Sequence, residues 1–356
     1  MPSKNMASAF ALTPKQMIKA VERNLKSGLV SSITGSPGIG KSDIVRKVAK
    51  KLNLKVIDIR LSQASPEDLN GFPAVIDGVA QFIPFDHFPT MLKEIPEGYS
   101  GWLIFFDEIT SAPKAVQAAS YKVILDRFIG NIPLHDACGI VAAGNLLSDK
   151  AVVVQQSTAL QSRLVQLELM VSAPEWIEWA HQNQKDPRVV AYISHDPDAL
   201  HVFDPNHNDK TFACPRTWDF VCRYIDDKPE LDFIDNANIV GMISQGMGVE
   251  FFEFCNVWKE LKTIDDIMAD PEHVAIPSNH GHKFAALGYL YSHVTKDNFE
   301  MLMKYITRFP EELQSVFMKG LAHRDASFRK HPVYVKNTVK LLRFIGEDEE
   351  DVFSVA

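Results

Sequence analysis

One glycine-rich stretch constrains the fold of this chain more than any other feature. It reads Gly35-Ser36-Pro37-Gly38-Ile39-Gly40-Lys41-Ser42 and matches the phosphate-binding pattern Gly-x-x-x-x-Gly-Lys-Ser/Thr. Residues 29–34, just before it, have the composition of a short strand, and residues 41–52 place apolar side chains on one helical face. A glycine-rich turn that merely enters a helix is the alternative. The order strand, glycine loop, helix favours a nucleoside triphosphate site.

Each part of this phosphate loop has a chemical role. Gly35, Gly38 and Gly40 let backbone N–H groups turn toward phosphate oxygens, and the following helix adds the partial positive charge of its N-terminus. The Lys41 ammonium can bridge the outer phosphates, and the Ser42 hydroxyl can ligate Mg²⁺. The whole loop, with Ser36, Pro37 and Ile39 between the glycines, is therefore predicted to bind ATP with Mg²⁺.

A pair of carboxylates forms the second chemical feature. The apolar run 102–106 is typical of a parallel strand buried on both faces, and Asp107 and Glu108 follow at its carboxyl end, where open α/β sheets bind ligands. Asp107 is predicted to hold Mg²⁺ through water, and Glu108 to orient and deprotonate an attacking water. An ordinary acidic turn is the alternative. A capped helix is predicted next, over residues 111–126.

A third buried strand is predicted over residues 139–145, and it ends in Asn145. The amide of Asn145 could hydrogen-bond the γ-phosphate or the attacking water. A lone asparagine more often ends a strand by capping the following turn. Its place beside two other strand ends favours the role at the phosphate.

The fold class follows from the order of these elements. A second strand at residues 54–59, joined to the first by a helix, indicates a parallel α/β sheet between helices. From residue 172 onward strand patterns cease, so the rest of the 356 residues is predicted to be helical. The predicted divisions are a leader at 1–12, an α/β nucleotide-binding core at 13–170, a helical lid domain at 171–295, and a helical C-terminal extension with an acidic tail at 296–356.

Composition limits the class of protein. The net charge of −8, from 45 acidic and 37 basic residues, disfavours a protein that coats nucleic acid non-specifically. A local basic channel that binds nucleic acid is still compatible with this charge. The first residues lack an apolar signal region, and no run approaches the roughly 18 apolar residues of a membrane span. A cytoplasmic location is therefore expected. The four cysteines show no CxxC spacing and are predicted to be reduced core thiols: Cys138, Cys214, Cys222 and Cys255.

In combination, these motifs resemble those of MoxR-type AAA+ ATPases. The resemblance spans about residues 14–225. It is carried by the phosphate loop, by the stretches Ser65-Pro66-Glu67-Asp68-Leu69-Asn70-Gly71 and Asp107-Glu108-Ile109-Thr110-Ser111-Ala112-Pro113 with Gln117, by Ala143-Gly144-Asn145, by Arg163 and by Cys214-Pro215-Arg216. It implies an AAA+ core with a P-loop, followed by the helical lid and extension.

The resemblance also implies roles for residues that spacing alone does not assign. Asn145 would be the first sensor, and Arg163, just before the last core strand, would reach into the nucleotide site of a neighbouring subunit. Arg216 would be a second sensor that contacts the nucleotide of its own subunit. Two residues depart from the family pattern: Leu146 replaces a proline, and Cys214 replaces a serine. Neither change removes a charged group.

The resemblance implies partners as well. Such proteins are ATPases that form homo-oligomers, most often hexamers, and act as chaperone-like remodellers of a protein substrate, often with a von Willebrand factor A-like partner. Two other functions remain open: a nucleic-acid motor or loader on the same core, and a small-molecule kinase that uses only the phosphate loop. A trans-acting arginine would be useless to a monomeric kinase.

Overall fold

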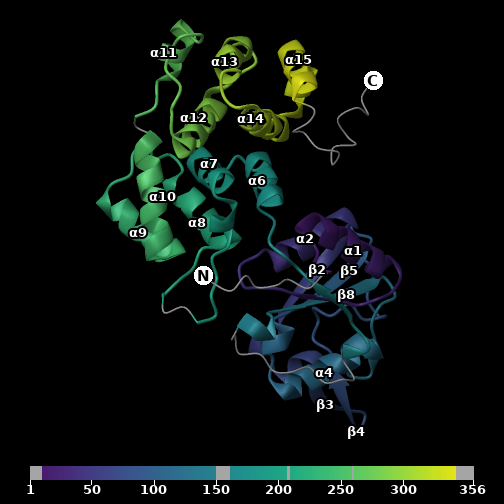
Figure 1. Ribbon diagram of the computed structural model, residues 1–356. Helices are drawn as coiled ribbons and strands as arrows, with labels where there is room; N and C mark the ends of the chain where they lie inside the picture. The colour runs from purple at the N-terminus through teal and green to yellow at the C-terminus, as the bar shows by residue number, and fades with distance from the viewer. Residues whose placement is uncertain (1–9, 150–160, 207–208, 259, 342–356) are drawn as a thin grey trace. The chain divides into compact units, whose positions relative to one another are not determined.

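The computed structural model describes residues 10–149, 161–206, 209–258 and 260–341, which form two compact units (Figure 1). The first unit is Met1–Ser172 with Asp204–Asn206, and the second comprises Ala173–Phe203 and His207–Ala356. Each unit has a hydrophobic core of its own. The predicted acidic tail at 347–351 and most of the predicted leader lie outside the described residues.

The first unit is built on a five-stranded parallel sheet with the strand order β2-β5-β8-β1-β9. β5 and β8 are buried along most of their length, which explains why both appear in the sequence as continuous apolar runs. Since the strands are parallel, their carboxyl ends lie along one edge. The strands are β1 Ser31–Thr34, β2 Leu54–Arg60, β5 Gly101–Asp107, β8 Cys138–Gly144 and β9 Val165–Glu168.

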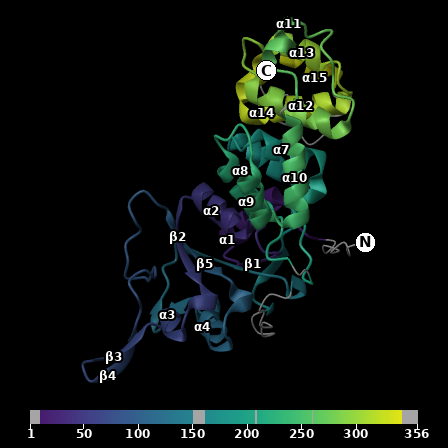
Figure 2. The same ribbon diagram turned by 90° about the vertical axis from the view of Figure 1, so that its left-hand side faces the viewer.

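Helices cover both faces of this sheet (Figures 1 and 2). On one face, α1 (Pro14–Lys26) and α2 (Lys41–Lys51) bury apolar side chains against Leu103 and Phe105 of β5. On the other face, α4 (Lys114–Leu125) packs against the alternate side chains of the same strand. The α/β fold class predicted from the sequence is therefore confirmed.

The start of α4 differs from the prediction. The helix was expected from Ser111, but a 3-10 turn, η2 (Ile109–Ser111), comes first and α4 begins at Lys114. Pro113 explains the difference, because proline drives the preceding residue out of the helical region, and Ala112 has a ψ of 143°. The turn packs against β8, with Thr110 beside Gly144.

A hairpin interrupts the alternation of strands and helices. β3 (Phe72–Ile76) and β4 (Val79–Ile83) pair around Asp77 and Gly78, whose φ angles of 53° and 79° suit the tight Asp-Gly turn. Figure 2 shows the hairpin extending away from the sheet of the first unit. Short elements flank it in the chain: η1 Leu61–Gln63, α3 Pro66–Asn70, β6 Phe128–Ile129, β7 Ile132–Pro133 and η3 Leu147–Asp149.

The second unit is helical. Prolines begin or precede several of its helices, where a missing backbone N–H has no cost. Its helices are α6 Ala173–Gln182, α7 Pro187–His195, α8 Pro215–Ile225, α9 Phe233–Ile243, α10 Gln245–Trp258, α11 Ile264–Ala269, α12 His280–His293, α13 Phe299–Ile306, α14 Glu311–Arg324 and α15 Pro332–Lys340, with the 3-10 turns η4 Pro197–Leu200 and η5 Ala326–Lys330.

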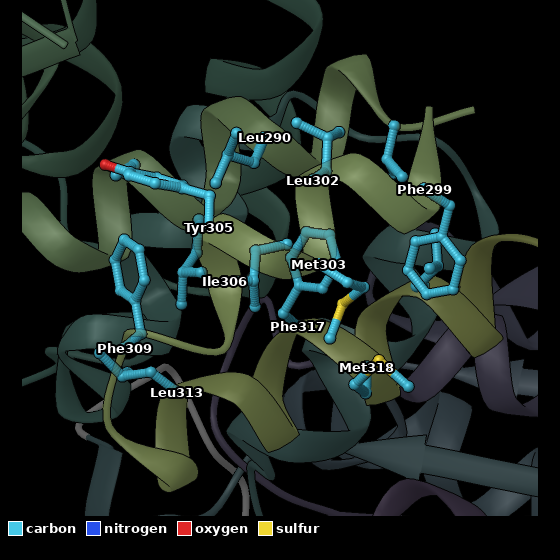
Figure 3. Close-up of a cluster of buried hydrophobic side chains, with 14 of the residues drawn as sticks. Leu290, Phe299, Leu302, Met303, Tyr305, Ile306, Phe309, Leu313, Phe317 and Met318 are labelled. Carbon is cyan, nitrogen blue, oxygen red and sulfur yellow. The ribbon is translucent and has the colours of Figure 1, made fainter. Parts of the chain in front are cut away.

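An apolar stripe on α13 forms part of the core of the second unit (Figure 3). Phe299, Leu302, Met303 and Ile306 recur at helical spacing, and each is at most 2% exposed. They pack among side chains of α12 and α14. The stripe is therefore core rather than a groove for a partner.

Two methionines on α13 provide a matched test of this core. Met303 is 2% exposed and Met301 is 37% exposed. Met303→Ala is expected to lower the free energy of unfolding by about 2–5 kcal/mol, because it leaves a cavity in the core. Met301→Ala removes the same atoms from a partly exposed site and should cost less than half as much. Urea unfolding followed by circular dichroism compares the two variants, and equal losses would contradict this packing.

Two further observations bear on the sequence predictions. All four cysteines are buried and unpaired by disulfides, as expected for reduced core thiols. Among the described residues, every helix is too short or too polar to span a lipid bilayer.

Candidate nucleotide-binding site

The phosphate loop connects β1 to α2 and depends on its glycines. Gly38 and Gly40 have φ angles of 79° and 94°, a region that side-chain-bearing residues rarely adopt. A Cβ at Gly40 would meet nothing within 4 Å, so the space beside the loop is open. A Cβ at Gly35, in contrast, would lie 2.7 Å from the Ile39 side chain. The loop is therefore a tight backbone turn with open space at the start of α2, as a phosphate cradle requires.

Lys41 joins this loop to the end of β8. Its ammonium donates hydrogen bonds to the carbonyl oxygens of Gly35 and Ser36, at 2.6 and 2.9 Å, and to the side-chain oxygen of Asn145 at 3.0 Å. The structure thus brings together two of the predicted site residues from distant parts of the chain. All three acceptors are uncharged, so phosphate oxygens could replace them as stronger partners.

Ser42 and Asp107 form the candidate magnesium site. The Ser42 hydroxyl donates to Asp107 Oδ2 at 3.2 Å, and the backbone N–H of Glu108 donates to Asp107 Oδ1 at 2.9 Å. Burial raises the pKa of Asp107 above its usual range, while these two hydrogen bonds act in the opposite direction. A hydroxyl and a partly desolvated carboxylate are hard oxygen donors, so the pair fits Mg²⁺.

Glu108 is held by two residues near the end of the neighbouring strand β2. Its backbone has a left-handed φ of 58°, which turns the chain sharply after β5. Its carboxylate accepts a hydrogen bond from the Ser62 hydroxyl and lies 3.9 Å from Arg60 Nε. No sequence pattern indicated Ser62 or Arg60. The order of the strands is needed to find them, because only the β2–β5 pairing sets Arg60 opposite Asp107.

Asp149 is a further residue at the loop that the sequence did not indicate. Its side chain is 5% exposed, and one carboxylate oxygen lies 3.5 Å from the Ser36 hydroxyl that donates to it. Burial raises the pKa of Asp149, and the nearby Lys41 ammonium opposes this shift. Asp149 therefore adds a carboxylate from η3 to the polar groups around the phosphate loop.

The two predicted arginines belong to different units of the chain, Arg163 to the first and Arg216 to the second. Arg163 is exposed and precedes β9, the edge strand, which pairs with β1 in parallel from Ser31 and Val165 onward. Gly35, where the phosphate loop begins, is four residues after Ser31, or about 13 Å farther along the sheet at 3.3 Å per residue. Arg163 comes two residues before Val165, the partner of Ser31. Arg163 therefore lies toward the opposite end of the sheet from the phosphate loop. Arg216 is exposed near the start of α8 and belongs to the second unit.

Comparison with known proteins identifies the core. Residues 32–164 match the family described as AAA domain (dynein-related subfamily). No curated protein matches the chain. Solved structures with a similar fold include the RuvB Holliday junction branch migration motor of Thermotoga maritima, at 19% identity and a TM-score of 0.36, covering 83% of this chain and 85% of that one. NtrX from Brucella abortus is another, at 15% identity and a TM-score of 0.40, and the match covers 92% of this chain and 67% of the NtrX chain.

Both TM-scores are below 0.5. The family match, in contrast, includes the phosphate loop, Asp107, Glu108 and Asn145, and ends one residue after Arg163. Residues 32–164 are therefore similar to AAA domains, and the unit that contains them has the AAA+ P-loop fold.

Proposed function

We propose that this protein is an AAA+ ATPase that hydrolyses ATP to ADP and phosphate. The observation that carries the proposal is the meeting of three strand ends. β1 leads into the loop with Lys41 and Ser42, β5 ends in Asp107 and Glu108, and β8 leads into Asn145. A phosphate cradle, a metal site, a carboxylate base and an amide are the groups that phosphoryl transfer to water requires.

Each residue then has a defined task. Lys41 would exchange its contacts with backbone carbonyls for contacts with phosphate oxygens. Ser42 and Asp107 would hold Mg²⁺, which neutralises charge on the phosphates when it is bound. Glu108 would accept a proton from the attacking water, and Asn145 would orient that water or the γ-phosphate by hydrogen bonding.

The finer proposal is a ring motor of MoxR type that remodels a protein partner in the cytoplasm. It keeps the divisions 13–170, 171–295 and 296–356 as core, lid and extension. The position of Arg163 supports it, because an exposed arginine at the far end of the sheet from its own phosphate loop is better placed to serve a neighbouring subunit. Arg216 is proposed to contact the nucleotide of its own subunit, and the ring is proposed to be a hexamer.

Three measurements test this function. The purified protein should hydrolyse ATP, and EDTA should abolish turnover by removing Mg²⁺. Light scattering with ATP should give the mass of a ring. Glu108→Gln, locked with ATP, should retain a protein substrate or a von Willebrand factor A-like partner during purification. Absence of Mg²⁺-dependent turnover would contradict the ATPase, and strong stimulation by nucleic acid would favour the alternative of a nucleic-acid motor or loader.

The contact between Ser62 and Glu108 gives a prediction about basal activity. The Ser62 hydroxyl occupies an acceptor site on Oε2 of Glu108, so that oxygen is less available to an attacking water while the hydrogen bond is formed. Ser62→Ala is expected to raise basal kcat by about 3- to 10-fold, the size of the net contribution of one typical intramolecular hydrogen bond.

Steady-state ATP hydrolysis measures this effect, and the double variant Ser62→Ala with Glu108→Gln is the control. The double variant should show no gain in kcat, because the amide that replaces the Glu108 carboxylate cannot act as a base. A fall in kcat for Ser62→Ala alone would mean that Ser62 holds Glu108 in its working position instead.

A further inference from the structure

We propose that Thr110 is a positioning residue that holds Asn145 in place beside the phosphate loop and links it to the segment carrying Glu108. The inference rests on the proposed ATPase function and assigns a task to a residue that none of the motif roles includes. Thr110 lies in η2, two residues after Glu108, and its side chain is 6% exposed. Its side chain contacts Gly144, the last residue of β8, and the backbone of Asn145.

The first observation is a hydrogen bond between two predicted motifs. The backbone N–H of Asn145 donates to the Thr110 hydroxyl oxygen at 3.0 Å. β8 has ended at Gly144, so this N–H is the first beyond the strand. In the β1–β8 pairing, Gly144 lies opposite Thr34, which sets Asn145 level with Gly35 at the start of the phosphate loop. Thr110 therefore anchors the peptide from which the Asn145 side chain reaches Lys41.

The second observation is the close approach of Thr110 to Gly144. A Cβ at residue 144 would lie 2.5 Å from both Oγ1 and Cγ2 of Thr110. A residue larger than glycine would push η2 away from β8 and break the hydrogen bond. The Thr110 side chain can therefore approach β8 this closely only because residue 144 is a glycine.

The third observation is that the turn carrying Thr110 is itself fixed. Gln117 of α4 is 2% exposed, and its side-chain amide donates to the carbonyl oxygens of Ile109 and Ala112, at 3.3 and 3.2 Å. These carbonyls flank Thr110 on both sides. Because α4 is packed into the sheet core, a displacement of η2 would have to break these bonds as well. The turn is a rigid support rather than a loose loop.

The chemical consequence concerns the relative position of two groups. Glu108 and Asn145 act on the same water or on the phosphate beside it, so an error of about 1 Å in either can cost much of the rate. Strand pairing alone fixes each of them only up to its strand end, because both side chains lie beyond the paired residues. The hydrogen bond between Thr110 and Asn145 connects the segment after β5 to the segment after β8, beyond the last paired residues of both strands.

The test compares Thr110→Val with Thr110→Ser. Valine keeps the shape but removes the acceptor, and serine keeps the acceptor but removes the methyl group. Thr110→Val is expected to lower kcat about tenfold with little change in ATP affinity, and Thr110→Ser should restore most of the rate. Hydrogen exchange of the peptide containing Asn145 should accelerate in the valine variant and not in the serine variant.

A double-mutant cycle with Asn145→Ala shows whether Thr110 acts through Asn145. If it does, adding Thr110→Val to Asn145→Ala should cause almost no further loss of kcat. Ser120→Ala is the control, since it removes another buried hydroxyl of the first unit, bonded to Gln117 within α4. It should change thermal stability but leave kcat unchanged.

Two outcomes would overturn the inference. Equal kcat for Thr110→Val and wild type, or fully additive losses in the cycle, would show that Thr110 does not position Asn145. If the wild-type protein hydrolysed no ATP, the proposed function would fail, but the contact would still be tested by exchange at Asn145. Unchanged exchange in Thr110→Val would then contradict the positioning itself.

Discussion

Lys41→Ala is expected to abolish ATP binding, whereas Glu108→Gln should bind ATP almost normally and lose turnover. The Lys41 ammonium lies at the loop with three uncharged acceptors, which phosphate oxygens would replace in the ground state. Its removal should raise the Kd for ATP about 100-fold or more, as expected for loss of charge-assisted hydrogen bonds. Loss of a general base should instead lower kcat by about 10²–10⁴.

Fluorescent ATP binding and steady-state hydrolysis separate the two variants. Lys47→Ala is a matched control for the first, because Lys47 is an exposed lysine on the same helix, α2. It should leave both Kd and kcat unchanged. Near-normal hydrolysis by Glu108→Gln would remove Glu108 from its role as base. Weak ATP binding by the same variant would show that it also shapes the ground-state site.

The parts of this site that are visible in the sequence share one physical property. The phosphate loop needs glycines and a lysine at fixed spacing, and β5 and β8 need continuous apolar runs because both of their faces are buried. These are local requirements. They were enough to predict the α/β core, and they named Lys41, Ser42, Asp107 and Asn145, which the structure brings into two hydrogen-bonded pairs.

The parts that the sequence does not reveal depend on pairing between distant segments. Ser62 meets Glu108 because β2 lies next to β5, and strand order has no local signal. Thr110 reaches Asn145 because the chain forms a 3-10 turn directly after Glu108 and packs that turn against the end of β8. Both residues are small and hydroxylic, a type common enough in turns that composition cannot single them out.

The last prediction concerns Arg163, which decides between a ring motor and a self-sufficient enzyme. Arg163→Ala is expected to bind ATP nearly normally and to hydrolyse it about 10³–10⁵-fold more slowly, the range reported for arginine fingers. The reason is that Arg163 precedes β9 at the far end of the sheet from its own phosphate loop, so its charge would act on a neighbour's γ-phosphate. Arg46→Ala is the control, because Arg46 pairs with surface carboxylates and should affect neither measurement.

Mixing Arg163→Ala with Lys41→Ala subunits tests the trans role directly. The first variant supplies an intact pocket and the second an intact arginine, so rings containing both should recover activity that neither has alone. Pairing of Arg163 with a carboxylate of its own surface is the alternative, and it predicts full turnover for Arg163→Ala.

If mixed rings of measured composition recovered nothing while wild-type rings worked, another residue would have to supply the charge. Arg127, the residue before β6, is the next candidate. In the structure, however, its guanidinium donates to the carbonyl oxygens of His135 and Cys138 of the same chain. To reach a neighbour it would have to break both bonds, and Arg127→Ala should therefore lower the stability of the core. A kcat loss in Arg127→Ala without a loss of stability would be needed to transfer the trans role to it.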